Sequence, residues 1–178
     1  MHNDHVNACI LLDILDKELA NLESGGEPDY LLMRDIIKYM VNYPDTVHHP
    51  LEEILFARLE KVDVESHDSI NRLYEEHNDL TFFGDELDDE LEKIAAGSIV
   101  KKDRLLQLCH KYRELLYSHM KTEEEKVFPR IERIFSITDW SEIKSSLETI
   151  EDPLFGEAVL DYYQRLYDRI QSEINQDE

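Results

Sequence analysis

The chain has 178 residues, a length typical of one compact domain, and its 41 acidic against 19 basic residues give a net charge of −22. So negative a chain repels phosphate backbones and anionic lipid headgroups, and we expect neither nucleic acid nor a membrane surface as a partner. The early apolar runs are too short to span a membrane, the first residues lack the basic start of a secretory signal, and two cysteines form no disulfide framework. These features predict a reduced, cytoplasmic protein.

Apolar residues recur at helical spacing along the chain, and no segment alternates as a strand does. The first predicted helix begins near Asn3 or Asp4, either of which could cap it, and ends at the turn 24–28, which contains two glycines and a proline. A second helical stretch follows, is disturbed by two prolines near its middle, and continues to Val62.

The third predicted helix starts at 66–68 and ends at Gly97, and the fourth covers about 101–135, with Pro129 kinking its last turns. Four long helices joined by short turns predict an all-α fold. We expect an up-down four-helix bundle over residues 1–136.

Residues 137–178 form a predicted C-terminal helical extension, with a short helix near 141–149, a break at 152–153, and fraying at 175–178. The extension ends in an amphipathic helix whose apolar residues follow helical spacing: Phe155, Val159, Tyr162, Tyr163, Leu166, Ile170 and Ile174. We expect this helix to cover the bundle. A contact with a protein partner or with a second copy of the chain is the alternative.

Four histidines are spaced so that one falls at the same height on each predicted helix. In an antiparallel hairpin, residues equidistant from the turn lie level with each other. The midpoints of His5 and His48, of His48 and His77, and of His77 and His119 all fall at the predicted turns. The spacing therefore predicts one layer of histidines inside the bundle.

Two carboxylates join this layer. Glu52 and Glu123 each lie four residues after one of these histidines and share its helix face. The similar pair His110 and Glu114 points to the opposite side of its helix, where we expect a solvated pair.

The register of the second helix has two alternatives. The pair His49 and Glu53 has the same spacing as His48 and Glu52, and Pro50 disturbs the local helix. We prefer His48 and Glu52 because the leucines that follow share their face.

Imidazoles and carboxylates that converge in an apolar bundle need something to offset their burial. Hydrogen-bonded core histidines are one interpretation, and a cation is the other. Imidazole with carboxylate suits iron, manganese or zinc. The Glu-x-x-His spacing of ferritin-like carboxylate bundles occurs nowhere in the chain.

These residues resemble the hemerythrin-like family, also called HHE cation-binding domains, over about residues 1–135. The resemblance rests on order, spacing and flanks: His5, the segment Tyr43–Phe56, Glu76-His77, His119–Glu124 and Val127–Pro129.

The resemblance implies two iron ions held between the helices and bridged by two carboxylates and an oxo or hydroxo group, with manganese or zinc as alternatives. It assigns terminal ligands to His5, His48, His77 and His119, and bridges to Glu52 and Glu123. Certain family members also use the residue after the second-helix histidine, which is His49 here.

The chain departs from the oxygen-carrying hemerythrins at two points. Those proteins have His-x-x-x-His on the third helix, whereas Leu73 and Thr81 stand four residues before and after His77. Their last carboxylate follows its histidine by five residues, which would select Glu124 over Glu123. Both departures argue against reversible oxygen carriage. In a site with two six-coordinate irons, one coordination position stays open if His49 is a ligand, and two stay open if it is not.

The resemblance thus favours binding or sensing of dioxygen, nitric oxide, peroxide or iron at an open coordination position. An enzyme that reduces nitric oxide or peroxide, or donates iron for iron–sulfur repair, is the alternative. A structural bundle that holds zinc or no metal is the third hypothesis.

Overall fold

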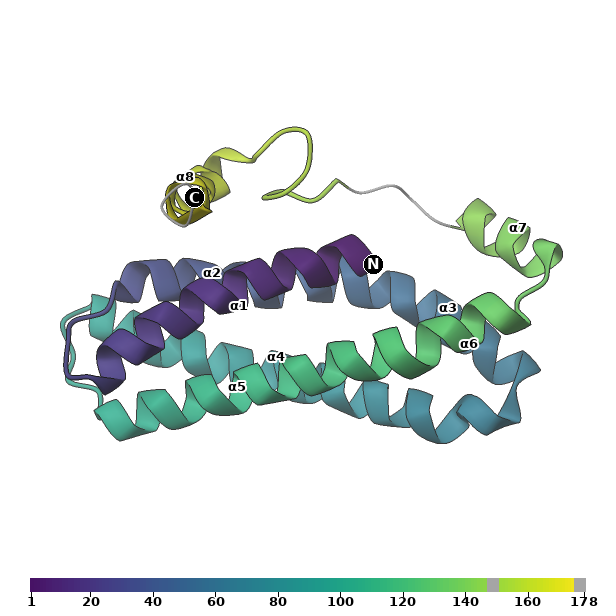
Figure 1. The fold of residues 1–178 in the computed structure, drawn as a ribbon, viewed down its shortest axis with the longest axis horizontal. Helices are drawn as coiled ribbons and strands as arrows, with labels where there is room; N and C mark the ends of the chain where they lie inside the picture. The colour runs from purple at the N-terminus through teal and green to yellow at the C-terminus, as the bar shows by residue number, and fades with distance from the viewer. Residues whose placement is uncertain (147–150, 175–178) are drawn as a thin grey trace.

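The computed structural model describes residues 1–146 and 151–174. Within them the chain forms helices and turns and no strand, as the all-α prediction requires (Figure 1). The described helices include none that is long and apolar enough to cross a membrane.

Four long helical segments run antiparallel and form the predicted bundle (Figure 1). The second and fourth segments each contain a short π-helical turn, η1 (Pro44–His48) and η3 (Glu123–Val127), between two α-helices. The bundle helices are α1 (His2–Glu23), α2 (Tyr30–Tyr43), α3 (His49–Val62), α4 (His67–Ala95), α5 (Lys102–Thr122) and α6 (Phe128–Ile134), with a 3-10 turn η2 (Val64–Ser66) before α4.

The two predicted glycine turns adopt a backbone conformation that favours glycine. Gly25, after α1, has φ +88°, and Gly97, after α4, has φ +80°. The predicted start of the first helix is wrong. Helix α1 begins at His2 with Met1 in the N-cap position, and no side chain caps it. Asp4 lies inside the first turn, and its carboxylate pairs with the chain's amino terminus at 3.0 Å.

The predicted disturbances at prolines are π turns rather than breaks. Pro50 and Pro129 each lie two residues after a π turn. A proline has no N–H, and its ring clashes with the carbonyl four residues back. In these turns the N–H of the preceding residue, His49 or Phe128, donates to the carbonyl five residues back. The wider turn relieves the clash and shifts the residues that face the interior by one position.

Two apolar clusters fill the bundle. The large core lies among α1, α2, α4 and α5 and includes Leu15, Leu19 and Leu87. The small core lies at the other end, around α3, the first turns of α4, and α6. Its buried members are Leu55, Phe56, Leu59, Ile70, Leu73, Val127, Ile131, Phe135 and Ile143. Burial of each large apolar side chain stabilises the fold by about 1.5–3 kcal/mol.

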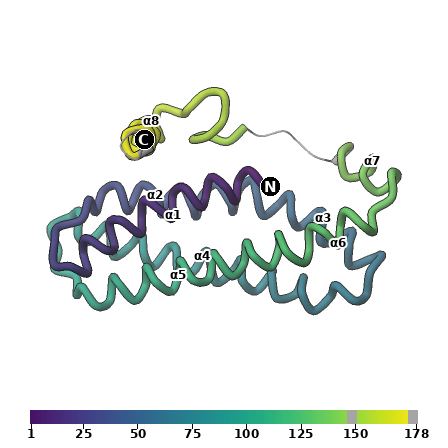
Figure 2. Tube along the Cα trace, viewed as in Figure 1, coloured from purple at the N-terminus to yellow at the C-terminus, as the bar shows by residue number. Residues whose placement is uncertain are grey.

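The C-terminal extension begins with α7 (Ile137–Ser146), four residues earlier than the expected start at 141, and the expected end of this helix lies outside the described residues. After residue 151 come a 3-10 turn, η4 (Asp161–Tyr163), and α8 (Gln164–Ile174). Helix α8 contacts α1 and α2, whereas α7 lies at the α3–α6 end of the bundle (Figure 2).

The predicted tail helix starts later than expected. Phe155 and Val159 lie in turns, because Asp152 accepts hydrogen bonds from the backbone N–H groups of Leu154 and Phe155 and reverses the chain. Leu166 and Ile170 of α8 are buried in the large core. The side chain of Ile174 and the segment 175–178 lie outside the described residues.

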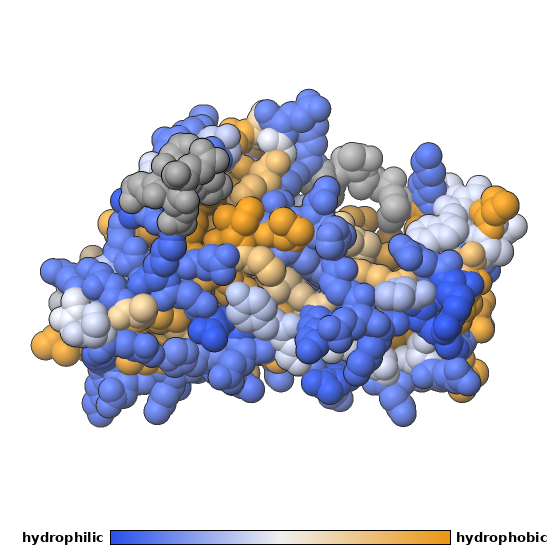
Figure 3. All heavy atoms as spheres, viewed as in Figure 1, coloured by the Kyte–Doolittle hydropathy of each residue, from blue (hydrophilic) through white to orange (hydrophobic). Residues whose placement is uncertain are grey.

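The visible surface is mostly hydrophilic, in keeping with the net charge (Figure 3). Apolar side chains gather where the C-terminal segment meets the bundle, as the same view shows. The extension therefore covers apolar surface of the bundle.

Candidate metal centre

The structure brings all seven predicted ligand side chains into one buried layer. Each is at most 8% exposed, and both glutamates are fully buried. This polar layer consists of His5, His48, His49, Glu52, His77, His119 and Glu123.

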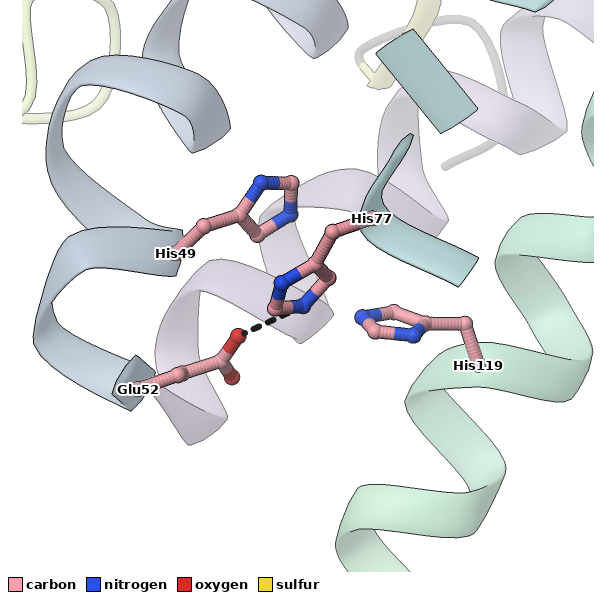
Figure 4. A group of neighbouring side chains, drawn as sticks. All are labelled: His49, Glu52, His77 and His119. Atoms are coloured by element: carbon pink, nitrogen blue, oxygen red, sulfur yellow. Dashed lines mark ion pairs between the residues drawn. The ribbon is translucent and has the colours of Figure 1, made fainter. Parts of the chain in front are cut away.

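The polar layer contains two groups of possible metal donors, and within each group the donor atoms lie within 4.8 Å of one another. The first group is His49, Glu52, His77 and His119, which point toward a common centre from α3, α4 and α5 (Figure 4). The second group is His5, His48, Glu52 and Glu123. Glu52 belongs to both groups.

Glu52 turns one carboxylate oxygen toward each group. Its Oε1 lies 3.0 Å from Nε2 of His48 and 4.0 Å from Nε2 of His5, while its Oε2 lies 3.4 Å from Nε2 of His77. A carboxylate in this position can bridge two cations.

Glu123 is placed in the same way. Its Oε2 lies 3.2 Å from Nε2 of His5, and its Oε1 lies 3.2 Å from Nε2 of His119 and 3.9 Å from that of His77. Neighbouring donors of a metal with bonds of about 2.1 Å are themselves about 3 Å apart. The spacing of donor atoms in the polar layer thus matches the edges of a coordination shell.

Several donor atoms of this layer have no partner that meets hydrogen-bond geometry among the described residues. They are both carboxylate oxygens of Glu52 and of Glu123, both ring nitrogens of His77, and Nε2 of His119. An unpaired buried polar group costs about 1–3 kcal/mol, and more if it is charged. Cations in the layer could satisfy the four carboxylate oxygens and the Nε2 atoms of His77 and His119 together, whereas Nδ1 of the His77 ring points away from them.

The outer ring nitrogens of two histidines donate to carboxylates that lie outside the polar layer. Nδ1 of His5 donates to Glu124 at 2.8 Å, and Nδ1 of His48 donates to Asp4 at 2.9 Å. The Nε2 atoms of these rings face each other at 3.2 Å. Two neutral rings held in this way direct two lone pairs at one another, which requires a proton or a cation between them.

Two more histidines are held in the same manner. Nδ1 of His49 donates to Asp45 at 3.1 Å, and Asp45 in turn accepts the hydroxyl of Thr81 at 3.0 Å. Nδ1 of His119 lies 3.3 Å from a carboxylate oxygen of Glu76. Such outer carboxylates fix the ring and raise its basicity toward a metal.

The first 131 residues match the family described as Hemerythrin HHE cation binding domain. The chain belongs to this family. Searches of the curated proteins and of the solved structures give no significant match. The hemerythrin-type domain binds cations, and its His/Glu groups in this chain are able to hold metal ions. The match ends within α6, so α7 and α8 lie beyond it.

The domain's polar layer includes both His48, the last residue of the π turn η1, and His49, the first residue of α3. Glu52 is fully buried in the layer, whereas Glu53 is exposed. Glu124, the five-spaced alternative to Glu123, lies outside the layer and accepts from His5.

The expected pairing of His110 is wrong. His110 lies at the surface, as predicted, but it pairs with Glu23 at 2.9 Å rather than with Glu114. Helices α1 and α5 are neighbours in the hemerythrin bundle, so a carboxylate from the adjacent helix reaches the ring.

Two histidines of the polar layer, His48 and His77, have raised pKa values. Burial alone would lower the pKa of His48, but Glu52 and Asp4 raise it to about 10. Burial also opposes the shift of His77, whose pKa Glu123 and Glu52 raise to about 9. Burial by contrast raises the pKa of Glu52, yet the histidines hold it below its ordinary value. Metal binding must therefore displace protons from this layer.

Beside the polar layer of the domain lies a cavity of about 40 Å³, which exceeds the ~10–15 Å³ that one water molecule needs. Imidazoles line one side, and the other wall is mainly apolar and aromatic, formed by Tyr39, Met40, Tyr43, Leu116 and Met120. Burial and the nearby Asp152 raise the pKa of Tyr39, so this phenol keeps its proton at neutral pH.

The role of the four outer carboxylates as partners of the histidine rings was not predicted from the sequence. Asp4 and Glu76 each directly precede a histidine of the polar layer, Glu124 follows Glu123, and Asp45 lies four residues before His49. Only the four-residue spacing of Asp45 and His49 indicates that two side chains share a helix face. The cross-helix partners could not be separated from the other acidic residues of the chain by spacing alone.

Proposed function

We propose that the chain holds two iron ions in the polar layer and binds or senses a small ligand, namely dioxygen, nitric oxide or peroxide, at an open coordination position. The observation that supports this most directly is that two fully buried glutamates each direct one oxygen to each donor group, with no hydrogen-bond partner among the described residues. Imidazole and carboxylate suit iron, and also manganese and zinc.

The two donor groups are unequal, which supports an open position at one of them. Three imidazoles, from His49, His77 and His119, face one position, whereas two, from His5 and His48, face the other. Glu52 belongs to both groups, and Glu123 of the second group also lies 3.2 Å from Nε2 of His119 in the first. When bound, iron would supply a reversible change of oxidation state and a site for an exogenous ligand.

His49 supports the proposed ligand set in place of the imidazole that oxygen-carrying members have on the third helix. At the corresponding positions of α4, Leu73 is fully buried and Thr81 donates to Asp45. Asp45 holds His49, and the ring of His49 stacks on that of His77 with centroids 3.9 Å apart. Thr81 thus helps to orient the substitute ligand.

The cavity beside the layer supports a small ligand. Its volume of about 40 Å³ accommodates a molecule of two or three heavy atoms, and its apolar wall offers few partners to a larger polar substrate.

Metal analysis and an optical spectrum of anaerobically purified protein test the proposal. We expect two irons per chain, one for each donor group, and a charge-transfer band of the bridged pair that His77→Ala abolishes. A single zinc, or a stability that does not depend on metal, would instead favour a structural bundle.

The same cavity and open position also suit an enzyme that reduces nitric oxide or peroxide, or a donor of iron for iron–sulfur repair. A multiple-turnover assay with peroxide or nitric oxide separates the functions. Sustained turnover favours the enzyme, whereas a single stoichiometric reaction favours binding or sensing.

A further inference from the structure

Four tyrosine rings form a continuous row from the interior of the bundle to its surface. Tyr43 stacks on Tyr39 with ring centroids 5.4 Å apart and an interplanar angle of 8°. The edge of Tyr163 meets Tyr39 at 5.6 Å, and Tyr162 meets Tyr163 at 4.9 Å. These separations are those of rings in direct contact. We call these four residues the tyrosine row.

The two ends of the tyrosine row lie in different surroundings. Tyr43 and Tyr39 are buried and line the cavity beside the polar layer, together with four of its imidazoles. Tyr162 is 66% exposed and lines a surface cavity of about 400 Å³, large enough for a small organic molecule. The row therefore connects the candidate metal centre to solvent.

Tyr39, inside the row, has a proton acceptor in place. Its hydroxyl donates to Oδ2 of Asp152 at 2.8 Å. The other oxygen of Asp152 accepts from the N–H groups of Leu154 and Phe155 at 2.8 and 2.9 Å, which fixes the carboxylate. A phenol loses an electron far more readily when its proton can move to a base at the same time. Tyr39 and Asp152 form such a pair.

We propose that the tyrosine row carries electrons between the surface and the metal pair, so that an oxidised centre is re-reduced through Tyr162. This inference rests on the proposed function, which supplies the oxidised metal pair. The reductant is a small organic one-electron donor that arrives at the surface cavity beside Tyr162.

The steps balance in electrons and protons. One electron leaves Tyr39 for a metal pair that peroxide has oxidised beyond its diferric state, the phenolic O–H bond breaks, and its proton moves to Asp152. An electron from Tyr162 then reaches the Tyr39 radical through the ring of Tyr163, Asp152 returns its proton to Tyr39, and Tyr162 loses its own proton to water. The external donor supplies one electron, water returns one proton, and Tyr162 is restored.

Packing alone does not account for this set of residues. Phenylalanine would fill the same space at Tyr39 without burying a hydroxyl that requires a carboxylate partner. The outer half of the row, with Tyr162, Tyr163 and Asp152, belongs to the segment beyond the family match. The proposal therefore gives this C-terminal segment a role at the centre.

Tyrosine-to-phenylalanine variants test the proposal because they keep the ring contacts and remove the phenolic proton. The full chain, loaded with iron in the diferric state, is oxidised with one equivalent of hydrogen peroxide, freeze-quenched, and examined for tyrosyl radical by electron paramagnetic resonance, with and without ascorbate as the donor. The variants are Tyr39→Phe, Tyr162→Phe and Asp152→Asn. Tyr117→Phe, a partly exposed tyrosine outside the row, is the matched control. Iron content is measured on every sample.

We expect a radical in the unaltered chain and in Tyr117→Phe that ascorbate removes quickly. Tyr39→Phe should lose it, Asp152→Asn should reduce its yield, and Tyr162→Phe should retain a radical that ascorbate removes slowly. A chain that binds iron but shows no radical would overturn this inference and leave the proposed function standing. A radical that none of the three row variants alters would do the same. A chain that binds no iron would overturn it together with the proposed function.

Discussion

The large core and the polar layer are equally buried, but they differ in what their burial costs. Leu15 and Leu87 are fully buried, and each stabilises the fold without any ligand. Glu52 and Glu123 are also fully buried, and their oxygens have no hydrogen-bond partner among the described residues. Apolar burial thus explains the bundle by itself, whereas burial of the layer requires another component to offset its cost.

The largest effect should come from metal removal. When the free concentration of an ion is about 1,000 times its dissociation constant, its binding adds about 4 kcal/mol to the free energy of unfolding. Chelation should therefore shift the denaturation midpoint strongly downward. Glu52→Gln should abolish this shift, because both donor groups share Glu52, while Glu53→Gln, at the exposed neighbouring position, should keep it. Denaturant titrations with and without chelator measure the difference, and an equal shift in both variants would contradict the account.

A truncation in the large core should behave in the opposite way. Leu87→Ala should lower the free energy of unfolding by about 2–5 kcal/mol, since it removes a fully buried side chain and leaves a cavity. The loss should be the same in metal-loaded and metal-free protein, as measured by urea denaturation. A loss that appears only with metal would break the distinction between core and layer.

An outer carboxylate should have a smaller effect that is confined to metal binding. Asp45→Asn should weaken the affinity of the group that contains His49 by about 10–100-fold, because the ring loses a charged acceptor that orients it. Asp16→Asn, which removes a surface partner of Arg113, is the control and should change nothing. Titration against a competing chelator measures both, and a loss of folding stability without loss of affinity would speak against an orienting role.

The smallest effect concerns Asp63, a buried carboxylate that, unlike those of the polar layer, is paired with an arginine of the same chain. Arg130 donates two hydrogen bonds to Asp63 at 2.7 Å, and together with Ser66 lowers the pKa of Asp63 to about 2. A carboxyl group whose pKa is lowered in the folded chain stabilises the fold at pH values above its ordinary pKa. Asp63→Asn should therefore be less stable than the unaltered chain at neutral pH, and the difference should disappear between about pH 4 and pH 2.

Urea denaturation as a function of pH tests this expectation. Glu65→Gln is the control, because Glu65 also pairs with Arg130 but is exposed. The difference should not depend on metal. A difference that grows as the pH falls would show that the sign is wrong.

The bundle and the height of the layer could be predicted because both depend on simple periodicities. Apolar spacing gave the helices, and the positions of His5, His48, His77 and His119 relative to three turns placed them at one level. The rise per residue and antiparallel packing are enough to predict this level.

The π turns could not be predicted, because apolar spacing does not show whether a backbone N–H donates to the carbonyl four or five residues back. Both His48, the last residue of η1, and His49, the first residue of α3, lie in the layer, although neighbouring residues on a helix differ by about 100° in direction. The tail helix was placed too early because Phe155 and Val159 follow helical spacing by chance, while Asp152 directs a turn there.

The most direct test of two cations in the polar layer is anomalous X-ray scattering from crystals of the iron-loaded chain. The account predicts two peaks, one among Nε2 of His49, His77 and His119 and one between Nε2 of His5 and His48, with Glu52 reaching both. A single peak, or none in the layer, would contradict it.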